Sequence, residues 1–257
     1  MHIPSVKEVV SAEEWQLRCD LAACYRLVAA YGWSDLVFTH ISARVPGDDH
    51  SFLINPYGLM FDEITASSLV LIDQEGNKRG ESPFPVNRAG FVIHSAIHAA
   101  RHDAQCVMHL HTPDGIAVSM LEEGLLPLNQ TAMLSAGGVA FHEFEGIAVD
   151  LDERERLAAD LGDKNLMLLR NHGTLALGGT VAEAFTAMYF LETACTIQVR
   201  ALGMNRPLHP VGDEAINKVA QFRNGVGPGG GTAGVARDLV WPAMLRKLDR
   251  LDPTWRG

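Results

Sequence analysis

Short apolar runs alternate along this chain with longer segments that begin at helix-start signals. Ser11 to Glu14 and Thr180 to Glu183 both follow the capping-box pattern, in which a serine or threonine stands three residues before a glutamate. The apolar runs between helices are bounded by turn residues, which is typical of strands. This alternation predicts an α/β fold. Strands are expected at Leu36 to Val45, Ser51 to Asn55, Leu69 to Asp73, Gln105 to His111, Leu166 to Arg170 and Thr174 to Leu177.

One domain spanning residues 1–257 is expected, with its core at about 11–205 and a C-terminal extension at 206–257. Apolar residues at helical spacing predict helices at about 11–31, 87–101, 151–161, 180–202 and 239–251, and Thr112 to Asp114 opens a further one. The final helix, which carries Trp241, could cover a neighbouring subunit or pack on its own domain.

The net charge of −10 argues against nucleic acid or an anionic membrane as the main partner. No apolar stretch approaches the roughly 18 residues of a membrane span, and no secretory signal is visible at the N-terminus. The four cysteines are scattered without a C-x-x-C pair, which favours a reducing, cytoplasmic setting. We therefore expect a cytoplasmic protein that acts on a small molecule.

Three histidines form the main candidate site. His109 and His111 stand two apart in a predicted strand, so their side chains should project from the same face. His172 lies between a buried strand and Gly173, at a junction where ligands are often carried. Three histidines with an open position form a known catalytic metal arrangement. The alternative is that His109 and His111 pair by chance and that His172 only stabilises a turn.

The other histidines are weaker candidates. His94 and His98 share a helix face, but no H-E-x-x-H motif accompanies them, so a role in the core or in supporting the site is favoured. His102, His142 and His209 are expected on the surface or in loops.

Several segments carry a resemblance to a known family, namely Thr39 to Arg44, Leu53 to Gly58, Asn87 to His98, Val107 to Pro113 and Leu168 to Gly173. Through them the chain resembles the class II aldolase/adducin family over roughly residues 11 to 205. The resemblance implies a three-layer α/β/α fold with a central, mostly antiparallel sheet, usually assembled as a homotetramer with intersubunit active sites. It also implies a divalent metal, zinc before manganese or iron, held by His109, His111 and His172.

The chain departs from the family's aldolases at the catalytic carboxylate. Their P-S-S-E segment carries an acid/base glutamate that falls here on Gly90, and the two serines fall on Arg88 and Ala89. The asparagine of the family's phosphate loop becomes His40. The chain is therefore similar to the adducin-like branch, and a phosphorylated substrate is not expected.

These features predict a metal-dependent lyase, either aldolase-type or a decarboxylase. Its substrate would be a small non-phosphorylated hydroxy, keto or aromatic acid, cleaved through a metal-stabilised enolate. Arg88 could bind a carboxylate, since its planar fork suits that group. His40 or His94 could transfer protons, and Tyr57 or Tyr189 could act as acids.

Two further hypotheses use the same residues. Three imidazoles could hold Fe(II) in an oxygenase, because ligand type alone does not separate zinc from iron. Alternatively, the chain could be a non-catalytic, adducin-like assembly module with a vestigial site. The three retained histidines argue against that last reading.

Overall fold

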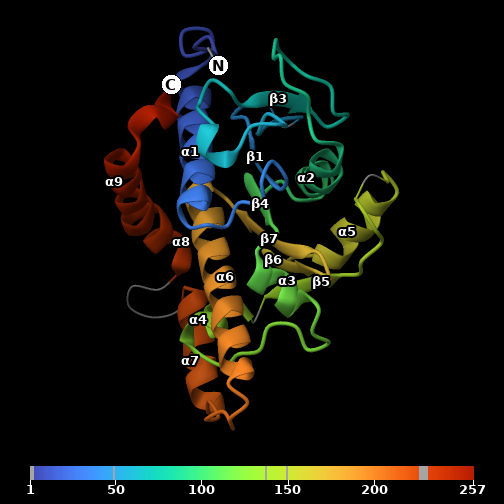
Figure 1. Cartoon of the computed structure of the whole chain (residues 1–257), viewed down its shortest axis with the longest axis vertical. Coiled ribbons are helices and arrows are strands. Elements are labelled where there is room, and N and C mark those ends of the chain that lie inside the picture. The colour runs from blue at the N-terminus through green and yellow to red at the C-terminus, as the bar shows by residue number, and fades with distance from the viewer. Residues whose placement is uncertain (1–2, 49, 137, 149, 226–230) are drawn as a thin grey trace.

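The fold is taken from a computed structural model, which describes residues 3–48, 50–136, 138–148, 150–225 and 231–257 (Figure 1). The helices are α1 (Ala12–Ala30), α2 (Arg88–Ala100), α3 (Pro113–Ser119), α4 (Gln130–Ala136), α5 (Glu153–Leu161), α6 (Val181–Gly203), α7 (Asp213–Arg223), α8 (Thr232–Val235) and α9 (Trp241–Leu251). The strands are β1 (His40–Arg44), β2 (Ser51–Ile54), β3 (Val70–Asp73), β4 (Cys106–Leu110), β5 (Val139–His142), β6 (Leu166–Leu169) and β7 (Gly173–Gly178).

The strands form one sheet in the order β3-β2-β1-β4-β7-β6-β5. Each neighbouring pair is antiparallel except β5 and β6, which run parallel. The expected α/β fold with a mostly antiparallel central sheet is therefore confirmed. β4 lies in the middle of the sheet, so both of its edges are paired.

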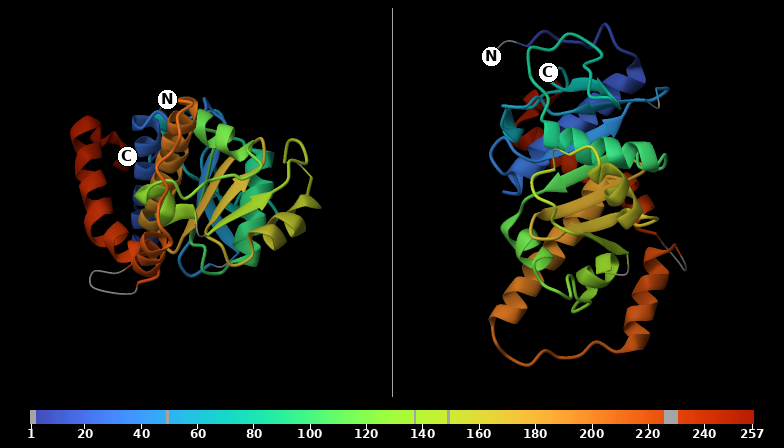
Figure 2. Two further views of the ribbon diagram at one scale, coloured as in Figure 1. Left: turned by 90° about the horizontal axis from the view of Figure 1, so that it is seen from below. Right: turned by 90° about the vertical axis from the view of Figure 1, so that its right-hand side faces the viewer.

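Helices cover both faces of the sheet, as Figure 2 shows in its left view, where α9 lies outside α1 and α6. Buried residues of α2 and α5 share one apolar cluster with Val107. Met108 and Leu110 belong to the cluster that contains α1 and α6. Because side chains alternate along a strand, His109 projects on the same face as Val107, toward α2. The candidate site therefore belongs to the α2 side of the sheet.

The predicted capping residues begin their helices as expected. The Ser11 hydroxyl accepts a hydrogen bond from the backbone N–H of Glu14, and Thr180 does the same for Glu183. Thr112 caps α3, with Pro113 in its first turn. These caps satisfy N–H groups that have no partner inside the helix.

The structure differs from the sequence-based expectation at the start of β1 and in several elements that the sequence did not indicate. The strand expected from Leu36 begins only at His40, because Leu36 and Thr39 have positive φ angles of 48° and 65°, which interrupt an extended strand. Helices α4 and α7 and strand β5 were not predicted. β5 has only four residues at the sheet edge. Its burial alternates, but Val139, Ala140 and Phe141 are apolar in succession, so the sequence shows no alternation of polarity.

The C-terminal helix packs on its own chain. The Trp241 indole N–H donates to Asp20 of α1 at 2.9 Å, and Arg26 of α1 pairs with Asp252 at 2.9 Å. Of the two roles considered for this helix, packing on α1 is the one observed within the chain. Among the described residues, no helix is long and apolar enough to span a membrane.

Candidate metal centre

β4 carries two of the candidate ligands at its C-terminal end. His109 pairs across the sheet with His40 of β1 and with Leu175 of β7, so it sits in the interior of the sheet and is buried. His111 follows one residue after the strand and is half-buried. Both imidazoles project on the same side, as their spacing predicts, with their ring centroids 4.7 Å apart.

The turn between β6 and β7 carries the third candidate ligand, His172. Asn171 adopts a left-handed φ of 55°, and the chain reverses at His172. A Cβ at Gly173 would lie 2.3 Å from the Leu110 carbonyl oxygen, so only glycine allows β7 to approach the end of β4 this closely. The His172 ring consequently lies 4.7 Å from that of His109 and 4.8 Å from that of His111.

Hydrogen bonds define which nitrogen of each ring is free. His109 Nδ1 lies 3.0 Å from the Thr174 carbonyl oxygen, which can only accept, so Nδ1 carries the proton. His111 Nδ1 lies 3.0 Å from Asp35 Oδ2 and donates to it in the same way. In the neutral form of each ring, Nε2 then carries a bare lone pair. These two Nε2 atoms face each other at 3.0 Å.

This arrangement fits a cation. Two facing lone pairs repel unless a positive charge lies between them, and nitrogens bound to one tetrahedral zinc stand roughly 3.3 Å apart. One donor atom from each of His109, His111 and His172 can be chosen so that all lie within 4.8 Å of one another. Burial lowers the pKa of His109 well below its usual value and that of His172 to about 4. Neutral imidazole is the form that binds a metal.

A buried carboxyl group supports these segments from the opposite face of the sheet. Glu192 of α6 accepts hydrogen bonds from the hydroxyls of Thr112 and Thr174. Thr112 follows His111, and the Thr174 carbonyl holds His109. Burial raises the pKa of Glu192 to about 7. The carboxyl thus ties together the two chain segments that carry the candidate ligands.

The His40 imidazole lies beside Gly90, the position where the sequence lacks a carboxylate. A Cβ at Gly90 would lie 2.6 Å from Cδ2 and 3.0 Å from Nε2 of His40. The His40 ring is buried, and its centroid is 5.3 Å from that of His109. His94 of α2 lies behind it, with its Nε2 3.1 Å from His40 Nδ1. The structure therefore brings His40 and His94 to the three histidines.

The other candidates stand at the start of α2, after β2 and on α6. Arg88 is exposed at the start of α2, two residues before Gly90. Tyr57 is half-buried between β2 and β3, and no described contact joins its ring to the histidines. Tyr189 of α6 packs with Tyr31 and Trp33 in an aromatic group.

Sequence reasoning missed Asp35 and Glu192. Nothing in the spacing distinguishes Asp35, whose position depends on the turn that ends α1. Glu192 did carry a signal, because it is a charged residue on the apolar face of α6 between Met188 and Cys195. The expectation of a surface position for His142 was wrong: it is buried, with Asp160 at 2.7 Å.

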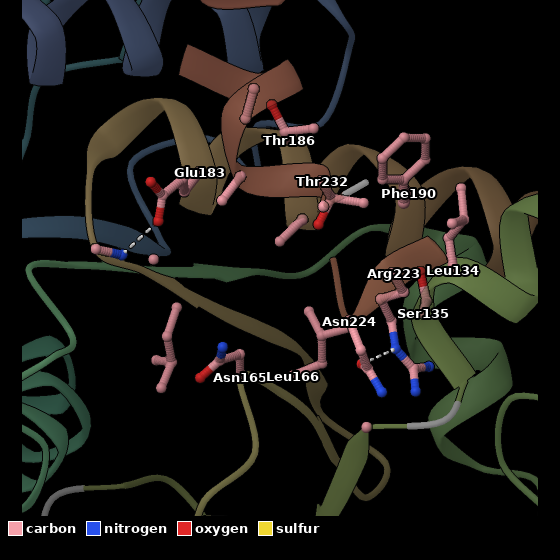
Figure 3. Close-up of a pocket in the computed structure, with 18 of the residues that line it drawn as sticks. Leu134, Ser135, Asn165, Leu166, Glu183, Thr186, Phe190, Arg223, Asn224 and Thr232 are labelled. Carbon is pink, nitrogen blue, oxygen red and sulfur yellow. Dashed lines mark hydrogen bonds between the residues drawn. The ribbon is translucent and has the colours of Figure 1, made fainter. Parts of the chain in front are cut away.

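A separate cavity of about 570 Å³ contains none of these histidines (Figure 3). It lies among α4, α6 and α7, and it is lined by Asn165 before β6 and by Leu177 and Gly178 at the end of β7. His172 lies at the opposite end of these two strands. The cavity therefore does not form part of the metal centre.

Known proteins are similar to this chain in sequence and in fold. The family described as Class II Aldolase and Adducin N-terminal domain matches residues 19–199. An aldolase II superfamily protein from Pseudomonas syringae has a TM-score of 0.90 and 50% identity, with 99% of this chain and 100% of that chain covered. The L-fuculose 1-phosphate aldolase from Glaciozyma antarctica PI12 has a TM-score of 0.82 and 29% identity, with 100% and 96% covered.

Alpha-adducin of Rattus norvegicus is also similar, with 49% identity over 189 residues. That match covers 72% of this chain but only 26% of the adducin. The matches to the family, to a structure and to an adducin agree over the segment that holds the histidines. This chain belongs to the class II aldolase and adducin family.

Proposed function

We propose that this protein is a divalent-metal-dependent lyase. It would cleave a carbon–carbon bond, by an aldolase-type or decarboxylase reaction, in a small non-phosphorylated hydroxy, keto or aromatic acid. The observation that carries the proposal is the 3.0 Å approach of the His109 and His111 Nε2 atoms, each with its proton placed on the other ring nitrogen by a hydrogen bond. Family membership supports a metal-dependent reaction at this position.

His109, His111 and His172 would hold the metal, for which we propose zinc, an ion that catalytic sites bind with three histidines and an open position. A bound divalent cation supplies Lewis acidity, which polarises a substrate oxygen and stabilises the negative charge that develops as the bond breaks. Asp35 and the Thr174 carbonyl hold two of the imidazoles in the required orientation.

His40 is the proposed proton acceptor in place of the missing glutamate. Its ring occupies the space beside Gly90, and burial lowers its pKa well below the usual value, so the imidazole is neutral. A neutral imidazole can take the hydroxyl proton that aldol cleavage releases. Decarboxylation would need no proton acceptor here, because the carboxylate leaves as carbon dioxide and the resulting carbanion takes a proton from water.

Arg88 is the proposed contact for the substrate carboxylate. It is exposed at the start of α2, two residues from Gly90 and on the helix that carries His94. A guanidinium binds a carboxylate through two parallel hydrogen bonds. The position supports recognition of an acid and not of a neutral sugar.

A homotetramer with active sites between subunits is the proposed assembly. Exposed apolar side chains flank the centre, which supports coverage by a second subunit. Phe144 is 54% exposed and lies 6.4 Å from the His172 ring, and Leu36, next to Asp35, is 61% exposed. The acidic chain would act in the cytoplasm.

The proposal is tested by metal analysis and an activity screen on one preparation. Purified protein is expected to contain about one divalent metal per chain and to release carbon dioxide or an aldehyde from members of a panel of hydroxy, keto and aromatic acids. Chelation and His111→Ala should both abolish the metal and the reaction, whereas exposed His102→Ala should change neither. Undiminished cleavage by metal-free protein would refute the proposal.

An adducin-like assembly module is the second candidate. The 49% identity to about a quarter of an alpha-adducin and the glycine at position 90 both favour it. In that case intact oligomers would be purified without metal, and the panel of acids would remain uncleaved. Oxygen consumption during turnover would instead indicate an Fe(II)-dependent reaction at the same histidines.

A further inference from the structure

A line of buried hydrogen bonds runs from His40 away from the metal centre. His40 Nδ1 lies 3.1 Å from His94 Nε2, and His94 Nδ1 makes a short hydrogen bond with the Ser42 hydroxyl. The same hydroxyl lies 2.7 Å from His98 Nε2, and His98 Nδ1 lies 3.1 Å from the Ala104 carbonyl oxygen. The four side chains are each at most 3% exposed.

The last member of this line sets the direction of every bond in it. A carbonyl oxygen can only accept, so His98 Nδ1 must donate to Ala104. Burial lowers the pKa of His98 to about 3, so the ring is neutral and its Nε2 must accept. The Ser42 hydroxyl therefore donates its only proton to His98.

The donor and acceptor roles of Ser42 also fix those of the hydrogen bonds nearer the metal centre. Because the Ser42 proton is used, its oxygen accepts from His94 Nδ1. Burial lowers the pKa of His94 well below its usual value, so this ring is also neutral and its Nε2 accepts from His40 Nδ1. The remaining nitrogen, His40 Nε2, carries no proton.

We propose that Ser42, His94 and His98 are positioning residues that hold His40 in one tautomer, with an unprotonated Nε2 beside Gly90. The catalytic meaning of this tautomer rests on the proposed function, but the tautomer itself depends on the hydrogen bonds and on the neutral state of the buried rings. The opposite direction would set a bare His98 lone pair against the Ala104 carbonyl, and a buried acceptor without a donor is costly.

This arrangement solves a problem that a lone imidazole would have. In water, a neutral histidine exchanges between two tautomers, and only the form with a free Nε2 could accept a substrate proton at that atom. A fixed tautomer keeps the accepting atom available in every molecule. A glutamate needs no such device, because either carboxylate oxygen can accept.

The direct test is nitrogen NMR of ¹⁵N-labelled, zinc-loaded protein, with His40 assigned by its loss in His40→Gln. We expect one tautomer for His40, with a pyrrole-type signal at Nδ1 and a pyridine-type signal at Nε2. Ser42→Ala removes the hydroxyl that orients His94, so the single pattern should be lost in favour of averaged signals. Ser95→Ala is the matched control, because that buried serine donates only to the Val92 carbonyl in its own helix.

An averaged or Nε2-protonated His40 in the unmodified protein would overturn the inference, and this result does not depend on any variant folding. An unchanged His40 pattern in a folded Ser42→Ala protein would overturn it as well. If a substrate is found, Ser42→Ala should lower kcat at least tenfold with little change in KM. The expected NMR patterns in a protein that cleaves nothing would support the tautomer and refute the proposed function.

Discussion

The imidazole of His40 occupies the space that a side chain at residue 90 would need, since a Cβ built on Gly90 meets the ring at 2.6 Å. The sequence departs from the aldolase pattern at both positions, and the two departures are sterically linked, because the His40 ring fits only beside a residue without a side chain. A larger residue at 90 would displace the ring, and the ring is held from behind by His94.

Gly90→Ala should destabilise the protein by about 1–3 kcal/mol, because the added methyl group overpacks a ring that is not free to move. The effect should largely disappear in a His40→Ala background, with a coupling of about 1 kcal/mol or more in a double-mutant cycle measured by urea unfolding. Gly80→Ala is the control, since nothing lies within 4 Å of its Cβ position. Simple additivity of the two substitutions would contradict the steric interpretation.

Gly173→Ala should weaken zinc binding about tenfold or more. Its Cβ would meet the Leu110 carbonyl oxygen at 2.3 Å and the His111 ring at 3.1 Å, so β7 must move away from the ligands on β4. Isothermal titration with zinc measures the change. Gly203→Ala at the end of α6, where the Cβ position is open, should leave the zinc Kd as it is. Equal affinity of the two variants would argue against a close approach of β7.

Asp35→Asn should raise the zinc Kd by roughly 10- to 100-fold, the range seen when a carboxylate behind a ligating histidine is removed. The change leaves the shape of the side chain but removes the charge that orients the His111 ring. Asp160→Asn makes the same chemical change at His142, outside the centre, and should not alter zinc binding. A common effect of both variants would indicate long-range charge and not ligand orientation.

Glu192→Gln should remove a pH dependence of stability. The folded pKa of about 7 lies above the usual value of 4.5, so between these values the folded state binds more protons than the unfolded state. The free energy of unfolding therefore falls as pH rises from 4.5 to 7, by at most about 1.4 kcal/mol per pH unit from this group. Urea unfolding in the presence of chelator measures the free energy of unfolding of both proteins. The value for the unmodified protein minus the value for the variant should fall as pH rises from 4.5 to 7. A constant difference would show that Glu192 does not titrate there.

The sequence predicted most of the regular structure, because long helices carry caps and apolar periodicity. Helices α1, α2 and α6 begin and end within a few residues of expectation. Prediction failed where tertiary contacts decide the conformation. Leu36 and Thr39 turn the chain before β1 with positive φ, and their side chains do not signal that conformation. The short β5 is a strand because β6 pairs with it.

The site was predictable only in part. The two-residue spacing of His109 and His111 needs no more than strand geometry, and His172 needed the additional evidence of its glycine turn. Asp35 and Glu192 reach the site from elements that are far away in sequence. The proposed positioning role of Ser42 depends on a register between β1 and α2 that no local pattern contains.

The line of hydrogen bonds behind His40 ends at the Ala104 carbonyl, a group that can neither release nor take up a proton near neutral pH. These hydrogen bonds can orient His40, but they cannot conduct a proton from His40 to solvent on the Ala104 side. A hydrogen that His40 removes from a substrate must therefore leave by the side from which it came. Once a substrate covers Nε2 of His40, this proton should stay with the bound reactants until the product leaves.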